Sequence, residues 1–152
     1  MKLTFQTEKW SDALPELLPL FDLLWNDVAV DKDRFTAVCD QAKYKTCEDA
    51  GILCLVTARA GTKLAGYYLM LVIPNPHYFG AGLMGYTDMY YMLPEYRKGA
   101  NGLRLFAFME ETLRAKGCVK AYTSHKLHRD RSEMFQALGW KPTDVVYSKV
   151  LA

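Results

Sequence analysis

Residues 94–102, PEYRKGANG, place two cations and three small residues directly before a segment with helical spacing of its apolar side chains. The first N–H groups of a helix have no intrahelical partner and carry the positive end of its dipole. Small residues in the preceding turn would let a phosphate approach those donors. A plain tight turn before a helix would use the same residue types. The anion site predicted here comprises Arg97, Lys98, Gly99, Ala100, Asn101 and Gly102.

The elements that must position this turn begin with a short strand at Lys2–Gln6. Ser11 or Asp12 is placed to cap a first helix, which Pro19 is expected to kink or split. A second helix is predicted after a polar connection. Its apolar face would consist of Phe35, Val38, Cys39 and Ala42.

The rest of the chain reads as strands with two more helices. Residues 52–58 and 64–73 are strand-like runs joined by a good hairpin turn, and residues 86–93 form a third such run. A long amphipathic helix follows Gly99 and ends at Gly117. The remaining expected elements are a strand at 118–124, a short helix opened by a capping box of Asp130 and Glu133, and a closing strand at 145–151.

The predicted order is β-α-α-β-β-β-α-β-α-β, which favours an α/β layered domain with both hairpin and crossover connections. A length of 152 residues without repeats or linkers predicts a single domain spanning 1–152. The net charge of +2 gives no indication of nucleic-acid binding. The N-terminus lacks the apolar run of a signal peptide, and no stretch is long enough for a bilayer span. The four cysteines and three histidines lack zinc-like spacing, so we expect a cytoplasmic protein with reduced thiols and no metal.

Residues 93–117, LPEYRKGANGLRLFAFMEETLRAKG, followed by HRDRSEMFQALGW at 128–140, resemble the acyl-CoA-binding core of the GNAT N-acyltransferase superfamily. The family signature is Arg or Gln, two residues, Gly, one residue, then Gly or Ala. Arg97 and Gly102 match its ends, whereas Ala100 stands where the first Gly is usual. Residues 128–151 are also similar to small GNAT-like proteins of phages. The resemblance implies a mixed, mostly antiparallel central sheet flanked by helices.

The resemblance further implies an acetyl-CoA-dependent transferase that acts on a primary amine. Backbone N–H groups from Arg97 to Gly102 would bind the pyrophosphate, and the pantetheine arm would pair with the strand ending at Met92 and Leu93. A backbone N–H near Met92 would stabilise the thioester oxyanion. That strand should separate from the next one. His128 falls where many relatives carry an Asn that contacts the pantetheine arm.

Proton transfer in this family implies a base on the strand before the signature, where Asp88 is the only acid. By strand alternation Asp88 should share a face with Tyr86, Tyr90 and Met92. A carboxylate hydrogen-bonded to a neighbouring strand or tyrosine is the alternative. The tyrosine that usually protonates the leaving thiolate is replaced by Phe135, and substitutes are left open. These comprise Tyr90, Tyr122, Tyr147 and solvent, of which Tyr90 is our candidate.

Several alternatives remain at this stage. GAGLMG at 80–85 matches a dinucleotide fingerprint in form, but a strand-like run follows it. A basic cluster would suit a nucleic-acid-binding module; it comprises Lys116, Lys120, Lys126, Arg129 and Arg131. A third hypothesis is a protein that binds a CoA thioester without transferring from it. We expect no nucleic-acid or membrane partner, leave a homodimer open, and expect residues 25–35 and 74–85 to shape the acceptor site.

Overall fold

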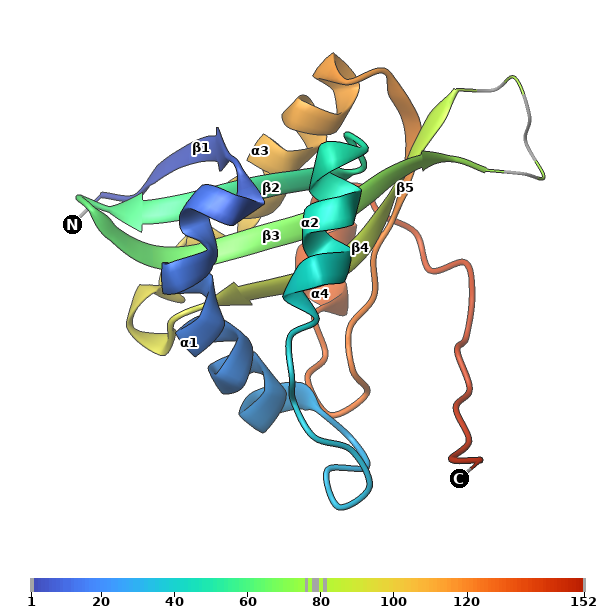
Figure 1. Ribbon diagram of the computed structural model, residues 1–152. Helices are drawn as coiled ribbons and strands as arrows, with labels where there is room; N and C mark the ends of the chain where they lie inside the picture. The colour runs from blue at the N-terminus through green and yellow to red at the C-terminus, as the bar shows by residue number, and fades with distance from the viewer. Residues whose placement is uncertain (1, 76, 78–79, 81, 152) are drawn as a thin grey trace.

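The computed structural model describes residues 2–75, 77, 80 and 82–151. It contains a five-stranded sheet in the order β1-β2-β3-β4-β5, antiparallel except for the parallel pair β4–β5 (Figure 1). The strands are β1 Thr4–Glu8, β2 Leu53–Ala60, β3 Lys63–Pro74, β4 Leu83–Met92 and β5 Cys118–Tyr122. The helices are α1 Trp10–Val28, α2 Gln41–Asp49, α3 Asn101–Ala115 and α4 Ser132–Ala137, with a 3-10 turn η2 at Pro94–Tyr96.

Helices cover both faces of this sheet (Figure 1). Alternation along β3 sends Tyr67 into a cluster with α1 and sends Tyr68 into a second cluster with α3. Both tyrosine side chains are almost completely buried, so β3 is the centre of the molecule. The mixed α/β fold with a mostly antiparallel sheet is as predicted, and the element order agrees from β1 through α4.

The start of α1 differs from the prediction because a distant side chain caps it. The helix begins at Trp10 after Lys9, without a side-chain cap from Ser11 or Asp12, and continues as one helix through Pro19. The Ser11 N–H donates to Glu48 Oε1 at 3.0 Å, which satisfies one of the open N-terminal donors. A cap supplied from α2 leaves no signature in the local sequence.

The second helix begins later than its apolar pattern indicated. Asp40 caps α2 by accepting the Lys43 N–H at 3.1 Å, so the helix starts at Gln41. Phe35 and Val38 therefore lie in the preceding connection, where both are exposed. The expected helical face was wrong because this spacing arises in irregular chain, with turn hydrogen bonds to the Asp31 carbonyl.

The last predicted elements are also corrected. Asp130 accepts the Ser132 N–H at 2.8 Å, but α4 begins at Ser132 and the Asp130–Glu133 capping box does not form. The expected closing strand at 145–151 is absent from the structure. Residues 141–151, here called the C-terminal arm, have no regular secondary structure. A strand needs a partner for its ladder, and the arm lies away from the sheet (Figure 1).

The described helices also bear on the membrane question. None of them combines the length and apolar content needed to cross a bilayer.

Candidate active site

A cavity opens where β4 and β5 part. The parallel pairing runs only from Leu83↔Cys118 to Tyr86↔Tyr122, although β4 continues to Met92. The separation of these strands, which the family resemblance implied, is therefore present. A cavity of about 830 Å³ fills the gap. Its walls come from the end of β4, the start of α3, residues 124–131, α4 and the end of α1.

Asp88 lies in this wall at an irregularity of β4. Thr87 pairs with Met70 and Met89 pairs with Leu69, so Asp88 is an extra residue without a partner on β3. Such a bulge shifts the alternation of a strand by one residue. Asp88 consequently faces α2, whereas Tyr90 packs in the α3 cluster. The predicted common face of Asp88 with Tyr90 and Met92 is wrong, because a bulge depends on pairing and alternation alone does not reveal it.

The environment of Asp88 suits a base. The Tyr44 hydroxyl donates to Asp88 Oδ2 at 2.6 Å, and Asp88 lines the cavity. Desolvation by the surrounding walls raises the pKa of Asp88, and the Tyr44 hydrogen bond opposes that rise. Desolvation also raises the pKa of Tyr44 far above its ordinary value, so Tyr44 stays a donor. A carboxylate with a raised pKa accepts a proton more readily at neutral pH.

Tyr90 spans the gap between the two strands. Its hydroxyl donates to the Ser124 carbonyl at 2.8 Å, and its ring packs edge-on against Phe106. Burial raises the pKa of Tyr90, which keeps the hydroxyl protonated. Phe135 is 8% exposed and packs against the same aromatic group, so it is a core residue beside the cavity. Of the three candidate tyrosines, Tyr90, Tyr122 and Tyr147, Tyr90 is thus the one nearest to Phe135.

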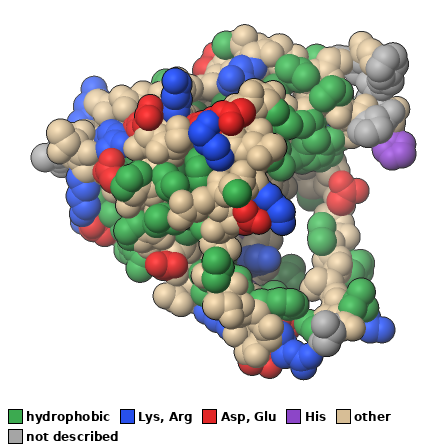
Figure 2. All heavy atoms as spheres, in the orientation of Figure 1, with side chains coloured by type: hydrophobic (Ala, Val, Ile, Leu, Met, Phe, Trp, Pro, Cys, Tyr) green, Lys and Arg blue, Asp and Glu red, His purple; other side chains and the backbone are tan. Residues whose placement is uncertain are grey.

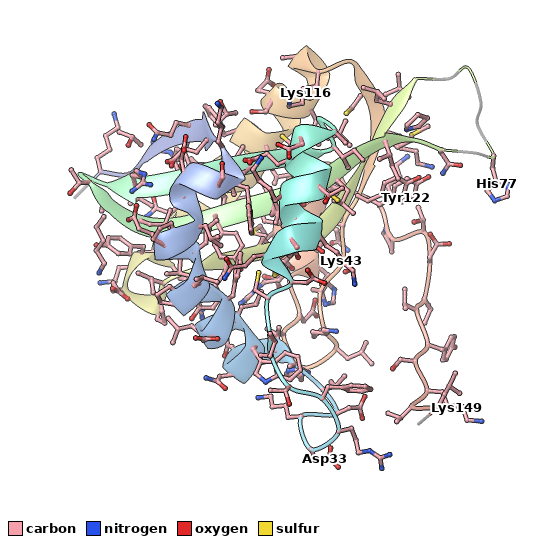
Figure 3. The ribbon with its side chains drawn as sticks, in the orientation of Figure 1. Asp33, Lys43, His77, Lys116, Tyr122 and Lys149 are labelled. Carbon is pink, nitrogen blue, oxygen red and sulfur yellow. The ribbon has the colours of Figure 1, made fainter. Side chains whose placement is uncertain are left out.

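The other two tyrosine candidates lie elsewhere. Tyr122 stacks on Tyr86 with ring centroids 5.1 Å apart, on the side of the sheet shown in Figure 3. Tyr147 lies in the C-terminal arm and is 89% exposed. Neither lines the cavity as far as the described residues go.

The start of α3 presents free backbone donors at the cavity edge. The Arg97 N–H bonds to the Pro94 carbonyl and the Asn101 N–H to the Lys98 carbonyl. Within the part of the chain that the structure describes, five neighbouring N–H groups have no such acceptor. They belong to Lys98, Gly99, Ala100, Gly102 and Leu103.

Gly99 and Gly102 differ in what a larger side chain would meet at each position of this turn. Gly99 has φ +55°, a left-handed conformation that L side chains rarely adopt. At Gly102 a Cβ would lie 3.2 Å from Met134 Sδ and would enter the cavity wall. Gly99 thus permits the left-handed turn, and Gly102 leaves room for the Met134 side chain in the cavity wall.

The Arg97 side chain points to β4 and not to these donors. Its Nε donates to the Met92 carbonyl at 2.7 Å, its guanidinium lies over the Tyr91 ring, and Nη2 is 3.5 Å from Asp27 Oδ2. Asp27 also pairs with Arg129 Nη2 at 2.5 Å. Asp27 at the end of α1 thereby links the predicted anion site to the segment after β5. Nothing in the sequence around Asp27 indicated this role.

Only some of the other residues predicted to bind the cofactor line the cavity. Met92, Arg97, Gly99 and Gly102 line the cavity; the Leu93 N–H instead bonds to the Ala65 carbonyl of β3. The Asn101 side chain donates to the Tyr96 carbonyl at 3.0 Å. His128 is exposed and is not among the described lining residues, so its cofactor contact stays a prediction.

His125 also lines the cavity. Its Nε2 lies 3.3 Å from Asp130 Oδ1 and its Nδ1 lies 3.0 Å from the Lys126 carbonyl. The third histidine, His77, lies at the far end of the β3–β4 connection, away from the body (Figure 3). Other parts of that predicted acceptor loop, residues 76, 78–79 and 81, are outside the described residues. Gly82 precedes a strand and not a helix, which excludes a dinucleotide fingerprint at 80–85.

The described residues contain no group of three or more His, Cys, Asp or Glu side chains arranged to hold a metal ion.

The cations of the basic cluster lie in different parts of the structure. Lys126, Arg129 and Arg131 line the cavity, whereas Lys116 lies beyond the far end of α3 (Figure 3). The cations therefore do not form one face for a nucleic-acid backbone.

Comparison with known proteins identifies the family. The family described as "Acetyltransferase (GNAT) family" matches residues 13–140. The chain belongs to the GNAT acetyltransferase family. A comparison with curated proteins finds no match.

Solved structures show the same fold at low sequence identity. Glucosamine-6-phosphate N-acetyltransferase from Arabidopsis thaliana has a TM-score of 0.75 at 14% identity, with 100% of both chains covered. The aminoglycoside acetyltransferase meta-AAC0020 from an uncultured soil metagenomic sample has a TM-score of 0.76 at 14% identity, covering 99% of this chain and 97% of that one. AAC(6')-Iy, in complex with the bisubstrate analogue CoA-S-monomethyl-acetylneamine, has a TM-score of 0.69 at 16% identity over 100% of both chains.

Proposed function

We propose that this chain transfers the acetyl group of acetyl-CoA to a primary amine by direct attack. The observation that carries the proposal is the row of unbonded N–H groups at the start of α3, beside the gap between β4 and β5. Oriented backbone donors at a helix N-terminus bind phosphate groups. A family neighbour in complex with a CoA bisubstrate analogue supports a CoA thioester as the donor.

The pyrophosphate of acetyl-CoA would lie on the N–H groups of Lys98, Gly99, Ala100, Gly102 and Leu103, with Asn101 and Arg97 flanking them. The pantetheine arm would run along the end of β4. The Leu93 N–H points to β3, so alternation directs the N–H and carbonyl of Met92 toward the gap. The Met92 carbonyl already accepts a hydrogen bond from Arg97 Nε. A pantetheine amide that donates to this carbonyl must therefore displace the guanidinium.

The proposed reaction begins when the neutral amine nitrogen attacks the thioester carbonyl carbon. A backbone N–H near Met92 stabilises the oxyanion, and Asp88 accepts the proton that the amine loses. Collapse of the intermediate breaks the C–S bond and releases the CoA thiolate, which takes the proton of Tyr90 after that hydroxyl leaves the Ser124 carbonyl. The products are an N-acetylated amine and CoA thiol. Protons return from Asp88 to Tyr90 through solvent.

The acceptor site is proposed at the mouth between α1, residues 29–35 and Asp88. Asp27 is already paired with Arg97 and Arg129, so it is a poor counter-charge for a cationic acceptor. Asp33 lies at the tip of the α1–α2 connection (Figure 3). The neighbours' names specify acceptors as different as glucosamine-6-phosphate and aminoglycosides, so the acceptor class is left to experiment.

The phenylalanine at position 135 favours a second candidate function. In this function the protein binds the CoA thioester and transfers its acyl group slowly or not at all. A phenylalanine cannot protonate the thiolate, and here it is packed in the core. The two candidates share the donor site and differ in chemistry. Thermal shift and calorimetry with acetyl-CoA, followed by thiol release with a panel of primary amines, separate them.

The variant Asp88→Asn sharpens that test because it keeps the shape of the carboxylate. A transferase should lose about 10²- to 10⁴-fold in kcat/KM, the usual contribution of a general base, with acetyl-CoA affinity unchanged. Binding without thiol release from any amine supports the second candidate. Absence of acetyl-CoA binding contradicts both.

A further inference from the structure

The Arg97 side chain lies across the end of β4, where the proposed function places the pantetheine arm. Its Nε donates to the Met92 carbonyl at 2.7 Å, and its guanidinium carbon is 4.9 Å from the centroid of the Tyr91 ring. A hydrogen bond from a charged donor is stronger than one from a neutral amide. A pantetheine amide that donates to the Met92 carbonyl therefore competes with a better donor that is already in place.

Asp27 holds the far end of the same guanidinium. Asp27 Oδ2 is 3.5 Å from Arg97 Nη2, and Asp27 Oδ1 is 2.5 Å from Arg129 Nη2. The Asp27 and Arg97 side chains are 22% and 33% exposed, so water and salt screen their attraction only in part. Figure 2 shows basic and acidic side chains interspersed over one face of the molecule, where opposite charges offset each other, so contacts at short range position a cation best. Three such contacts hold the guanidinium, with Met92, Tyr91 and Asp27.

A diphosphate would offer Arg97 a second position. Arg97 directly precedes the five free N–H groups at the start of α3, and consecutive Cα atoms are only about 3.8 Å apart. A guanidinium binds phosphate oxygens through two parallel hydrogen bonds, which a single carbonyl oxygen does not provide. With Nε on Met92 and Nη2 toward Asp27, the guanidinium points away from these N–H groups. Contact with a phosphate bound there therefore requires Arg97 to leave both partners.

We propose that Arg97 and Asp27 select the acyl donor by its diphosphate, an inference that rests on acyl-CoA as the donor. Without a diphosphate, Asp27 keeps Arg97 on the Met92 carbonyl, and an acyl-pantetheine has to displace it. With a diphosphate at the start of α3, the guanidinium moves to the phosphate oxygens and leaves the Met92 carbonyl to the pantetheine amide. The nucleotide half of acyl-CoA thereby opens the site for the thioester half.

The affinity for free pantetheine measures how firmly Arg97 is held on Met92. Pantetheine is uncharged, so its affinity does not report the general loss of a cation. Arg97→Met keeps a long side chain without the donors, and calorimetry should show roughly tenfold tighter pantetheine binding, because a charged hydrogen bond no longer has to be broken. The control Arg104→Met removes a cation from the first turn of α3 and should leave pantetheine affinity unchanged.

Asp27→Asn separates the hold on Arg97 from the presence of Arg97. Loss of a partly exposed ion pair should tighten pantetheine binding by about two- to fivefold. In the Arg97→Met background the same substitution should give no further gain, because the side chain that Asp27 holds is then absent.

A second measurement uses the wild-type chain and does not depend on these variants. The carbon-13 NMR signal of the Met92 carbonyl reports the hydrogen bond from Arg97. Adenosine 5′-diphosphate (ADP) has a diphosphate but no pantetheine arm. At saturation it should move the Met92 signal to lower chemical shift, as loss of a hydrogen bond at a carbonyl does.

Tighter pantetheine binding in Arg97→Met together with the shifted Met92 signal supports the proposal. A folded Arg97→Met variant whose pantetheine affinity is unchanged or lower overturns it. ADP that fails to bind, or that binds and leaves the Met92 signal in place, overturns it equally. If the wild-type chain binds CoA in any of these cases, the donor site of the proposed function stands; absence of CoA binding overturns both.

Discussion

Replacement of Gly102 by Glu tests the anion site directly. The added side chain starts 3.2 Å from Met134 Sδ and would place a carboxylate beside the five free N–H groups. A hydrogen bond to a charged group contributes about 1.5–3 kcal/mol. Loss of two of the five phosphate hydrogen bonds therefore costs about 3–6 kcal/mol, a 10²- to 10⁴-fold rise in the Kd of CoA.

Isothermal titration calorimetry with CoA measures this change, and a thermal shift with and without CoA gives an independent reading. Gly102→Ala is the matched control. Its Cβ displaces only the flexible end of Met134, so we expect at most a severalfold change in Kd. A Gly102→Glu variant that folds, shown by an unchanged circular dichroism spectrum, and binds CoA with wild-type affinity would refute the placement of the pyrophosphate.

Three other predictions concern protons. Asp88→Asn should lower kcat/KM about 10²- to 10⁴-fold without changing the Kd of acetyl-CoA, measured by thiol release and calorimetry. Burial raises the pKa of Asp88 and the Tyr44 hydrogen bond lowers it, so Tyr44→Phe should move the acid limb of kcat/KM to higher pH; an unmoved limb contradicts Asp88 as the base. Arg59 Nε lies 2.7 Å from Glu8 Oε1, and the hydrogen bonds of Arg59 are the largest cause that lowers the pKa of Glu8 from 4.5 to about 2. The resulting stabilisation, at most about 3 kcal/mol, is present above pH 4.5 and lost as the pH falls toward 2. Arg59→Met should reduce that pH dependence of urea unfolding, and the part due to the Thr57 and Gln6 hydrogen bonds should remain.

Short sequence patterns predicted the helices and strands around the site, because turn residues and apolar spacing within each segment determine where these elements begin and end. The turn at 59–63 joins two strand-like runs, and the β2–β3 hairpin forms there. Small residues before a periodic apolar segment predicted the start of α3, and the helix begins at Asn101. The family resemblance, carried by residues 93–117 and 128–140, agrees with the family match over residues 13–140.

Contacts between two elements that are distant in the sequence were not predictable from short sequence patterns. The bulge at Asp88 exists only in the pairing of β4 with β3, so alternation assigned the wrong face relative to Tyr90. The contact of Tyr44 with Asp88 joins residues that are 44 positions apart. The cap of α1 comes from Glu48, and residues 145–151 do not pair with any of the described strands. For the bulge, the Tyr44 contact and the cap of α1, a distant part of the molecule supplies what the local sequence does not contain.

The central claim is that the free N–H groups at the start of α3 hold the diphosphate of an acyl-CoA whose thioester lies between β4 and β5. A crystal structure of the chain with acetyl-CoA measures this most directly. We predict pyrophosphate oxygens within hydrogen-bond distance of the N–H groups of Gly99 and Gly102, and the acetyl group in the cavity between Asp88 and Tyr90. Density for the nucleotide elsewhere on the protein, with these N–H groups bound to water alone, would contradict the account.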